Sequence, residues 1–344
     1  MNFRLSPRMT KKRQDSPQGL PKGPGIIAIT LTILLVTLGG ARSAQAATRV
    51  VTLVTSQGNA YEEVRARISK SLEHVDELVL HSFDVGELDI LDKSTPHFRD
   101  SELVVTVGTS ALKYMATNHP EATVLAVFVT SYSYQAVMAE VSPRDHRFFG
   151  LFIDQPLERY LLLTRLLLPE ATALSVSGLE LANGVAQQEN TPISHCNFQL
   201  EAVKMSADSN PIRLLDSYYT RSDAFLVFPQ SSAQNRNIAK WILYLASRHR
   251  KPVIAFSEKY VDGGALASVF AAPSDIAKET HDVLAKWQST GIPEVPWGKT
   301  GNIFTVKTNS RIARFLKLDI ASESQLQMNL AKEGIAQHCE QNET

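Results

Sequence analysis

The chain has 344 residues, of which 44% are hydrophobic and 20% charged, with 35 basic and 35 acidic side chains. This length can build one large domain or two of ordinary size. The composition excludes a disordered, collagen-like or coiled-coil protein. Its two cysteines exclude a disulfide-dense scaffold and a zinc site with four cysteine ligands.

The zero net charge of the chain is the average of two unlike parts. Residues 1–46 hold seven basic side chains against Asp15 alone, a net charge of +6, which leaves −6 for the remainder. A mildly acidic body lacks the basic surface with which proteins bind DNA or RNA. We therefore expect no nucleic-acid partner.

Residues 1–46 have the pattern of a secretory signal peptide. A basic stretch precedes the apolar run Ile26–Leu38, which is followed by Ala44-Gln45-Ala46, and these are the three parts that such a peptide needs. Thirteen apolar residues span about 20 Å as a helix, less than the ~30 Å core of a bilayer, so an uncleaved membrane anchor is the less favoured alternative. We expect a cleaved, exported protein in the periplasm.

Short β-rich runs alternate with amphipathic helical stretches in the first part of the exported chain. Their largely continuous apolar character is typical of parallel strands that are buried on both faces. The predicted strands are Arg49–Thr55, Glu77–Phe83, Leu103–Val107 and Thr123–Val129, and the predicted helices are Tyr61–Leu72 and one that begins at Ala111.

A second series of the same kind follows. Its predicted strands are Phe149–Ile153, Ala173–Ser177, Phe198–Met205, Ala224–Phe228, Pro252–Phe256, Leu266–Phe270 and Ile303–Val306, and its helices are Leu157–Leu168, Gln234–Ser247, Ser274–Gln288 and Ser310–Leu316. Two such series predict two α/β lobes with parallel sheets, each of ordinary domain size. We place the first connection between the lobes at Ser131–Phe148, and we expect the polar residues after Ser322 to be frayed.

The predicted organisation of the chain has five parts. They are a signal peptide (1–46), an N-terminal lobe (47–140), a C-terminal lobe (141–270), crossover helices and a strand that pack back across both lobes (271–322), and a polar tail (323–344).

The sequence has no pattern that predicts an enzyme, a cofactor or a metal site. Gly298-Lys299-Thr300 is similar to the end of a P-loop, but Pro293 stands where that motif needs a glycine. The nine histidines include no H-E-x-x-H motif, and no G-x-S-x-G motif occurs. We therefore expect a protein that binds its ligand without converting it.

The two cysteines lie in the pairs His195-Cys196 and His338-Cys339. A metal shared by both pairs would lack the usual ligand spacing. Two free thiols are the default expectation, and a disulfide between Cys196 and Cys339 is an open alternative in an oxidising compartment.

Polar residues recur where predicted strands end. They are Ser56-Gln57, Gly108-Thr109-Ser110, Ser131-Tyr132, Gln230-Ser231 and Ser257-Glu258. In open α/β sheets ligands bind beyond the carboxyl ends of the strands, and the helix N-termini there attract anions. Any one of these residues could simply cap a helix, but their recurrence in both series predicts a shared ligand-binding cleft. We expect Thr109 and Ser110 to bind a carboxylate, Glu258 an ammonium group, and Tyr132 to form an aromatic wall.

The stretch Lys251–Glu258 (KPVIAFSE), followed by Gly263–Ser268 (GGALAS), resembles the ABC-transporter substrate-binding family that includes tryptophan-binding proteins. Leu103–Ala111 is similar to that family's V-G-T turn between a strand and a helix. The resemblance implies a type I periplasmic-binding-protein fold with two α/β lobes, three crossovers and a ligand in the cleft. It places Gly108 on the wall of the first lobe, and Gly264 and Ala265 near the second.

These observations predict a periplasmic protein that captures a small organic solute, such as an amino acid or a related carboxylate, and delivers it to an ABC permease. The alternative is a periplasmic sensor of the same fold that signals to a membrane sensor kinase. We expect a monomer.

Overall fold

The computed structural model describes residues 49–73, 75, 78–88, 101–141, 147–177, 193–204, 210–229, 236–291, 293 and 304–332. All of them lie in a compact unit, Thr48–Thr344, that is distinct from Met1–Ala47. The predicted signal peptide lies outside the described residues. No helix within the described ranges is long and apolar enough to cross a membrane.

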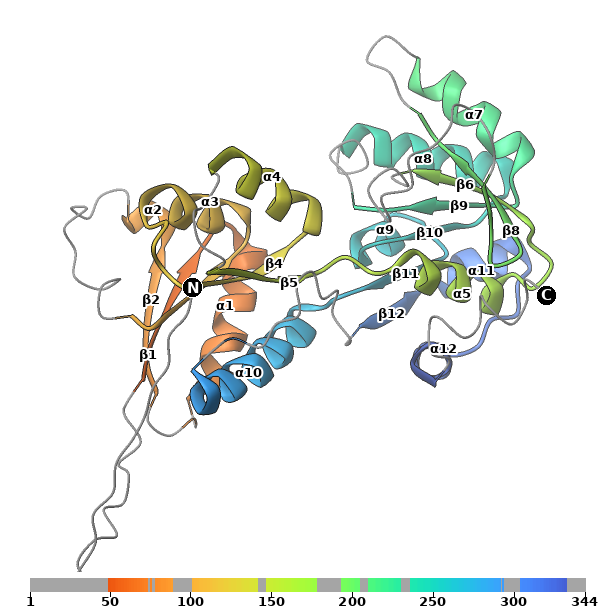
Figure 1. Cartoon of the computed structure of the whole chain (residues 1–344). Coiled ribbons are helices and arrows are strands. Elements are labelled where there is room, and N and C mark those ends of the chain that lie inside the picture. Colours follow the sequence, from red (N-terminus) through yellow and green to blue (C-terminus); the bar gives the residue numbers. More distant parts are fainter. Residues whose placement is uncertain are drawn as a thin grey trace, which may run out of the picture. The chain divides into compact units, whose positions relative to one another are not determined.

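The first sheet has five strands, all parallel, in the order β2-β1-β3-β4-β5 (Figure 1). In register, Val51 of β1 lies opposite Val79 of β2 and Leu103 of β3. The strands are β1 (Arg49–Thr55), β2 (Leu78–Asp84), β3 (Leu103–Val107), β4 (Val124–Val129) and β5 (Phe148–Phe152), and the helices between them are α1 (Asn59–Leu72), α2 (Val85–Leu88), α3 (Thr109–Asn118) and α4 (Ser131–Val141).

The second sheet has seven strands in the order β12-β11-β10-β9-β6-β8-β7, of which the outermost two, β12 and β7, pair antiparallel to their neighbours. The five inner strands repeat the strand order of the first sheet. The strands are β6 (Ala173–Ser177), β7 (Ile193–His195), β8 (Phe198–Ala202), β9 (Ala224–Val227), β10 (Val253–Ala255), β11 (Ala267–Phe270) and β12 (Thr305–Thr308). The helices are α5 (Leu157–Leu167), α7 (Pro211–Arg221), α8 (Arg236–His249), α9 (Glu258–Asp262), α11 (Ser310–Leu316) and α12 (Glu323–Lys332).

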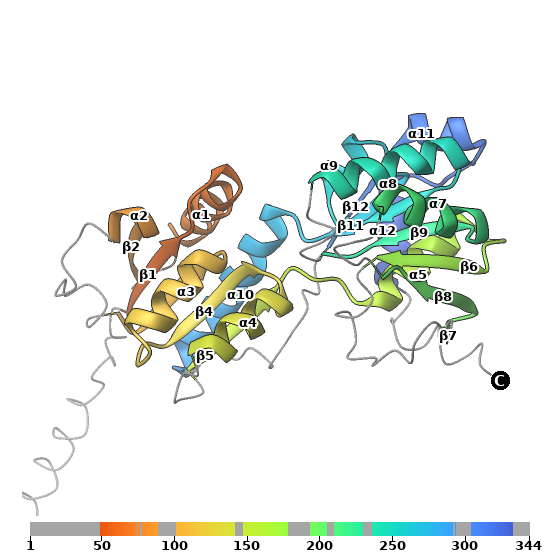
Figure 2. The ribbon, with the colours of Figure 1, turned by 90° about the horizontal axis from the view of Figure 1, so that it is seen from above.

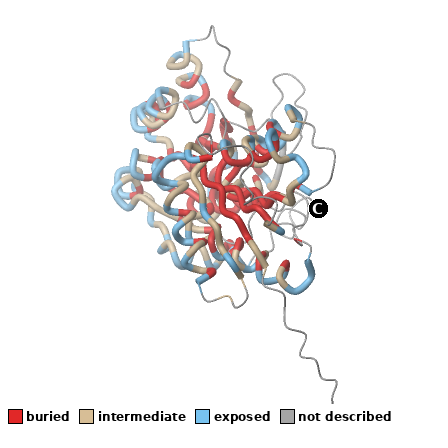
Figure 3. The backbone as a smooth tube through the Cα atoms, turned by 90° about the vertical axis from the view of Figure 1, so that its left-hand side faces the viewer, coloured by how far each residue is buried: buried red, intermediate tan, exposed pale blue. Residues whose placement is uncertain are grey.

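Both faces of the first sheet are covered because alternate side chains of each strand point to opposite faces. Val51 and Leu53 pack with α1 on one face, whereas Val54 packs with Leu112 of α3 on the other. The helix α10 (Pro273–Thr290) also covers the first sheet, where Trp287 is only 1% exposed. Buried residues gather toward the centre of the view in Figure 3, and exposed residues lie around them.

The chain passes between the two sheets three times. It leaves the first sheet after β5 at 153–156, returns after β11 at 271–272 to form α10, and enters the second sheet again at β12. Helices α7 and α8 cover one face of the second sheet, and α5 and α12 cover the other (Figure 2). This is the arrangement of two lobes and three crossovers that the resemblance implied.

Two sequence-based expectations about the elements are wrong. Residues 148–152 do not begin the second series, because β5 pairs with β4 in the first sheet, and the chain leaves that sheet only at 153–156. A short apolar run such as FFGLF fits either sheet, so its pattern alone does not identify its neighbour. Residues 323–332 are not frayed as expected, because α12 buries Leu326 and Leu330 against the second sheet, while the rest of the predicted tail lies outside the described residues.

The expectation of two free thiols also fails at Cys196, which is disulfide-bonded. Cys196 and Asn197 form the two-residue turn between β7 and β8, with φ angles of 49° and 61°. Positive φ at both positions is typical of the tight turn that joins two antiparallel strands. The other cysteine of the chain, Cys339, lies outside the described residues.

Candidate functional site at the carboxyl ends of the strands

The turns after β1 and β3 form the switch point of the first sheet, where the strand order reverses and where ligands bind in folds of this kind. The structure brings the predicted residues of these turns together. The Ser56 N–H donates to the Val107 carbonyl oxygen at 2.9 Å, and Ser56 Oγ accepts a hydrogen bond from the Ala111 N–H at 3.0 Å. Ser56 is buried, Thr109 is half-buried, and Gln57 and Ser110 are exposed.

Gly108 lies against Tyr61 of α1 and against Ser56. Its φ of +90° lies in the region that favours glycine, and a Cβ there would stand 2.6 Å from Tyr61 Cε1 and 2.7 Å from Ser56 Oγ. A glycine therefore allows the ring of Tyr61 to close on the start of α3.

An aromatic pair lies beside this switch point. The rings of Tyr61 and Phe128 meet edge to face with centroids 5.8 Å apart. Phe128 has a φ of +55° and lies at a break in the register between β4 and β5, the mark of a β-bulge. A bulky residue with positive φ is unusual, and such strain concentrates at functional sites. Both rings are half-buried and pack, as Ile153 does, against the core of the first sheet, so the two rings form a partly exposed aromatic wall.

Tyr61 and Phe128 were not among the predicted site residues, most of which are polar groups at the ends of strands. Phe128 lies in the apolar run VLAVFV, where nothing in the sequence marks the bulge. Tyr132, which was predicted to be the aromatic wall, follows on α4 and is 45% exposed.

The helix N-termini at this edge differ in how many of their N–H groups are already bonded. Helix α1 begins after Gly58 without a side-chain cap, so its first backbone N–H groups can donate hydrogen bonds to an anion. At α4, by contrast, the Ser131 N–H donates to Asp154 Oδ2 at 2.5 Å, and the Ser133 N–H donates to Thr130 Oγ1 at 3.1 Å. Desolvation raises the pKa of the Asp154 carboxyl. The predicted contact of a ligand with the Ser131 amide would therefore have to displace Asp154.

At the second sheet the structure places the predicted residues at opposite ends of the strands. Gln230 and Ser231 follow β9 but lie outside the described residues. Ser257 and Glu258 follow β10, and Glu258 Oε1 lies 3.7 Å from Lys307 Nζ. Gly264 and Ala265 precede β11, so they lie at its amino end and not with the other predicted residues.

A buried polar cluster that sequence reasoning missed lies where the chain first leaves the first sheet. Arg159 is 6% exposed, bonds Gln155, and lies 4.2 Å from the ring centroid of Phe304. Burial lowers the pKa of Arg159 to about 10, while the nearby Glu279 carboxylate acts in the opposite direction.

Tyr160, the next residue along α5, is fully buried. Its ring centroid lies 4.2 Å from that of Phe228 at the end of β9. Its hydroxyl has no hydrogen-bond partner among the described residues. This places an unsatisfied donor close to the carboxyl end of the second sheet.

The first switch point offers a hydroxyl group, helix N-terminal amides and an aromatic wall, which together can hold an anionic end and an apolar end of one small molecule. Within the described ranges, no group of His, Cys, Asp and Glu residues could hold a metal ion.

No family model matches the sequence, and no curated protein sequence is a significant match. Among solved structures, the chain is similar to an ABC domain in complex with L-Trp from Streptococcus pneumoniae, with 14% identity and a TM-score of 0.53 over 83% of this chain and 99% of that chain. It is also similar to a ligand-free, open substrate-binding protein with adhesive properties from Clostridium difficile, with 15% identity and a TM-score of 0.60 over 80% and 96% of the two chains.

A third similar structure is a conserved domain protein from Vibrio cholerae, with 15% identity and a TM-score of 0.50 over 82% of this chain and 98% of that chain. Each likeness covers both lobes, since it spans at least four fifths of this chain. The fold is therefore that of the type I periplasmic binding proteins, as the sequence resemblance implied.

Proposed function

We propose that the chain is an exported solute-binding protein that captures one small organic solute and delivers it to an ABC permease. The observation that carries this proposal is the first switch point, where Ser56, Tyr61, Gly108 and Phe128 come together in a fold shared with substrate-binding proteins. Binding sites in such sheets lie beyond the carboxyl ends of the strands.

The proposed substrate class is an amino acid or related carboxylate with an apolar or aromatic side chain. The N-termini of α1 and α3, with Thr109 and Ser110, would bind the carboxylate. Tyr61 and Phe128, with the exposed ring of Tyr132, would contact the apolar part. The L-Trp complex of a similarly folded domain supports this class.

The second lobe would complete the site with Gln230, Ser231, Ser257 and Glu258. Glu258 lies close to Lys307, so binding of a substrate ammonium by its carboxylate would compete with that contact. A solute that touches both lobes stabilises the arrangement in which both can reach it, and the three crossovers are the segments that would bend.

The proposed location is the periplasm, after cleavage of the signal peptide at residue 46. The disulfide of Cys196 supports this location, because structural disulfides persist in oxidising compartments and are rare in the cytosol.

A thermal-shift screen of residues 48–344 against amino acids, organic acids, sugars and nucleobases tests the proposal. A solute at roughly 100 times its Kd should stabilise the folded state by about 2.7 kcal/mol and raise Tm by several degrees. Phe128→Ala should abolish the shift, whereas Phe315→Ala, at a ring that is 46% exposed on the second lobe, should retain it. A folded protein that no solute stabilises would contradict the proposal.

A further inference from the structure

Helices α8 and α11 carry basic and aromatic residues but no acidic residue. The sequence of α8 is RNIAKWILYLASRH, and that of α11 is SRIARFL. Residues 47–344 have a net charge of −6, so two helices without a single carboxylate concentrate positive charge on one part of an otherwise acidic body. Such a concentration attracts anionic partners.

The aromatic residues of these helices are exposed. Tyr244 is 56% exposed, Phe315 46% and Trp241 36%, and these are three of the six large hydrophobic side chains exposed among the described residues. The rings of Trp241 and Tyr244 meet edge to face at 6.1 Å on α8, whose opposite face buries Ile242 and Leu245. Helix α8 is therefore amphipathic, with aromatic and basic residues on its outer side.

The end of α8 and α11 meet at Arg250, which follows α8 and whose guanidinium carbon lies 5.8 Å from the ring centroid of Phe315. Within the described ranges, Arg248, Arg250, Arg311 and Arg314 form no ion pair. Their charges are thus available to a partner. We call this surface the basic aromatic face, defined by Lys240, Trp241, Tyr244, Arg248, Arg250, Arg311, Arg314 and Phe315.

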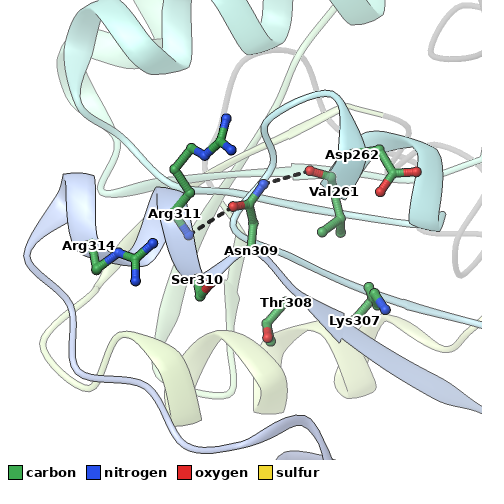
Figure 4. Close-up of a pocket in the computed structure, with 8 residues that line it drawn as sticks. All are labelled: Val261, Asp262, Lys307, Thr308, Asn309, Ser310, Arg311 and Arg314. Carbon is green, nitrogen blue, oxygen red and sulfur yellow. Dashed lines mark hydrogen bonds between the residues drawn. The ribbon is translucent and has the colours of Figure 1, made fainter.

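A cavity of about 400 Å³ opens beside α11, and Lys307, Arg311 and Arg314 outnumber Asp262 in its lining (Figure 4). The Asn309 side chain already accepts the N–H groups of Arg311 and Ile312, so the positive character of the cavity comes from side chains. Figure 4 shows Arg311 and Arg314 extending in different directions from α11. They therefore suit several separate anionic groups better than one small anion.

Apart from Lys307, which also lies 3.7 Å from Glu258, this cavity lies away from the proposed solute site. Asn309 donates its backbone N–H to the Leu266 carbonyl oxygen and its side-chain amide to that of Val261, which places the cavity at the amino end of β11. Solutes are expected at the opposite, carboxyl ends of the parallel strands.

We propose that the basic aromatic face binds the surface of an anionic phospholipid bilayer. Arg and Lys bind lipid phosphates, and Trp and Tyr rings prefer the interface between headgroups and acyl chains. No aliphatic side chain is among the large hydrophobic residues exposed on the described part of this face, unlike the apolar centre of many protein interfaces. An exported chain meets such a bilayer, so the face would hold the protein beside the membrane without spanning it.

The test is flotation of residues 48–344 with vesicles of phosphatidylglycerol or of phosphatidylcholine, at low and at 0.5 M salt. We expect association with phosphatidylglycerol vesicles only, reversed by salt, and a blue shift of tryptophan emission that Trp241→Phe removes. Arg311→Gln with Arg314→Gln should weaken partitioning about 30-fold. The matched control, Arg67→Gln with Lys113→Gln, removes the same charge from exposed positions on the first lobe and should leave partitioning unchanged.

Each other outcome overturns the proposal. Absence of binding to phosphatidylglycerol vesicles at low salt would mean that the face serves an acidic protein partner or no partner. Equal losses in the two double variants would mean that net charge, and not this face, drives association. Equal binding to both lipids would exclude recognition of anionic phosphates. Circular dichroism spectra of all variants would show that they remain folded.

Discussion

Replacement of Gly108 by alanine tests how tightly the first switch point is built. The backbone cost of φ +90° for a residue with a Cβ is about 1–3 kcal/mol. Crowding of that Cβ against Tyr61 Cε1 at 2.6 Å and Ser56 Oγ at 2.7 Å adds about 1–3 kcal/mol. Alanine also lowers the conformational entropy of the unfolded chain, which offsets about 0.4–1 kcal/mol of this loss of stability. Gly108→Ala should therefore lower the free energy of unfolding by roughly 1–5.5 kcal/mol.

The chain contains a matched control for this substitution. Gly264 also has a positive φ, +118°, but a Cβ there would have no neighbour within 4 Å. Gly264→Ala should lower the free energy of unfolding by the backbone cost alone. Its loss should therefore be smaller than that of Gly108→Ala by about 1–3 kcal/mol. Urea unfolding followed by circular dichroism gives both values, if the slope with denaturant is unchanged. Equal losses in the two variants would refute the close contact of Tyr61 with Gly108.

Three further predictions concern other parts of the molecule. Because burial raises the pKa of Asp154 in the folded state, its contribution to stability is present below the ordinary value of 3.8 and is lost as the pH rises through the raised pKa. In Asp154→Asn the free energy of unfolding, measured by urea titration, should fall less as the pH rises. A fall as steep as that of the wild type would contradict the raised pKa of Asp154. Reduction of the Cys196 disulfide should cost about 2–4 kcal/mol and lower Tm, whereas the reductant should not affect Cys196→Ser. Leu326→Ala should cost about 2–5 kcal/mol because that side chain is 1% exposed, whereas Met328→Ala, at 43%, should cost much less; equal effects would mean that α12 does not pack as described.

The strands were the most predictable part of the fold. Arg49–Thr55 and Ala173–Ser177 have the predicted bounds, because buried parallel strands are continuous apolar runs with polar or glycine residues at their ends. The partner of a strand was less predictable, as β5 shows, since pairing is decided by packing between segments that are distant in the sequence.

Helices α7 and α12 were not predicted. The Asn210 side chain accepts the N–H groups of Ile212 and Arg213, and Pro211 occupies the first turn of α7, a start that the sequence does encode. Helix α12 was missed because its buried stripe is only Leu326 and Leu330 in an otherwise polar tail.

The candidate site was predictable in its polar part only. Ser56 and Gly108 follow strands whose ends could be recognised, and parallel pairing brings those ends together. Phe128 reaches its position through a bulge in β4, and Arg159 is buried at a crossover, and neither feature has a local sequence signal.

Titration calorimetry of residues 48–344 with the solute that gives the largest thermal shift tests the proposed function most directly. We predict one bound solute per chain, weakened by at least tenfold in Tyr61→Ala and unchanged in Tyr244→Ala, an exposed tyrosine on α8. Binding that is equally strong in wild type and Tyr61→Ala would contradict the site at the first switch point, and the absence of any saturable binding would contradict the proposed function itself.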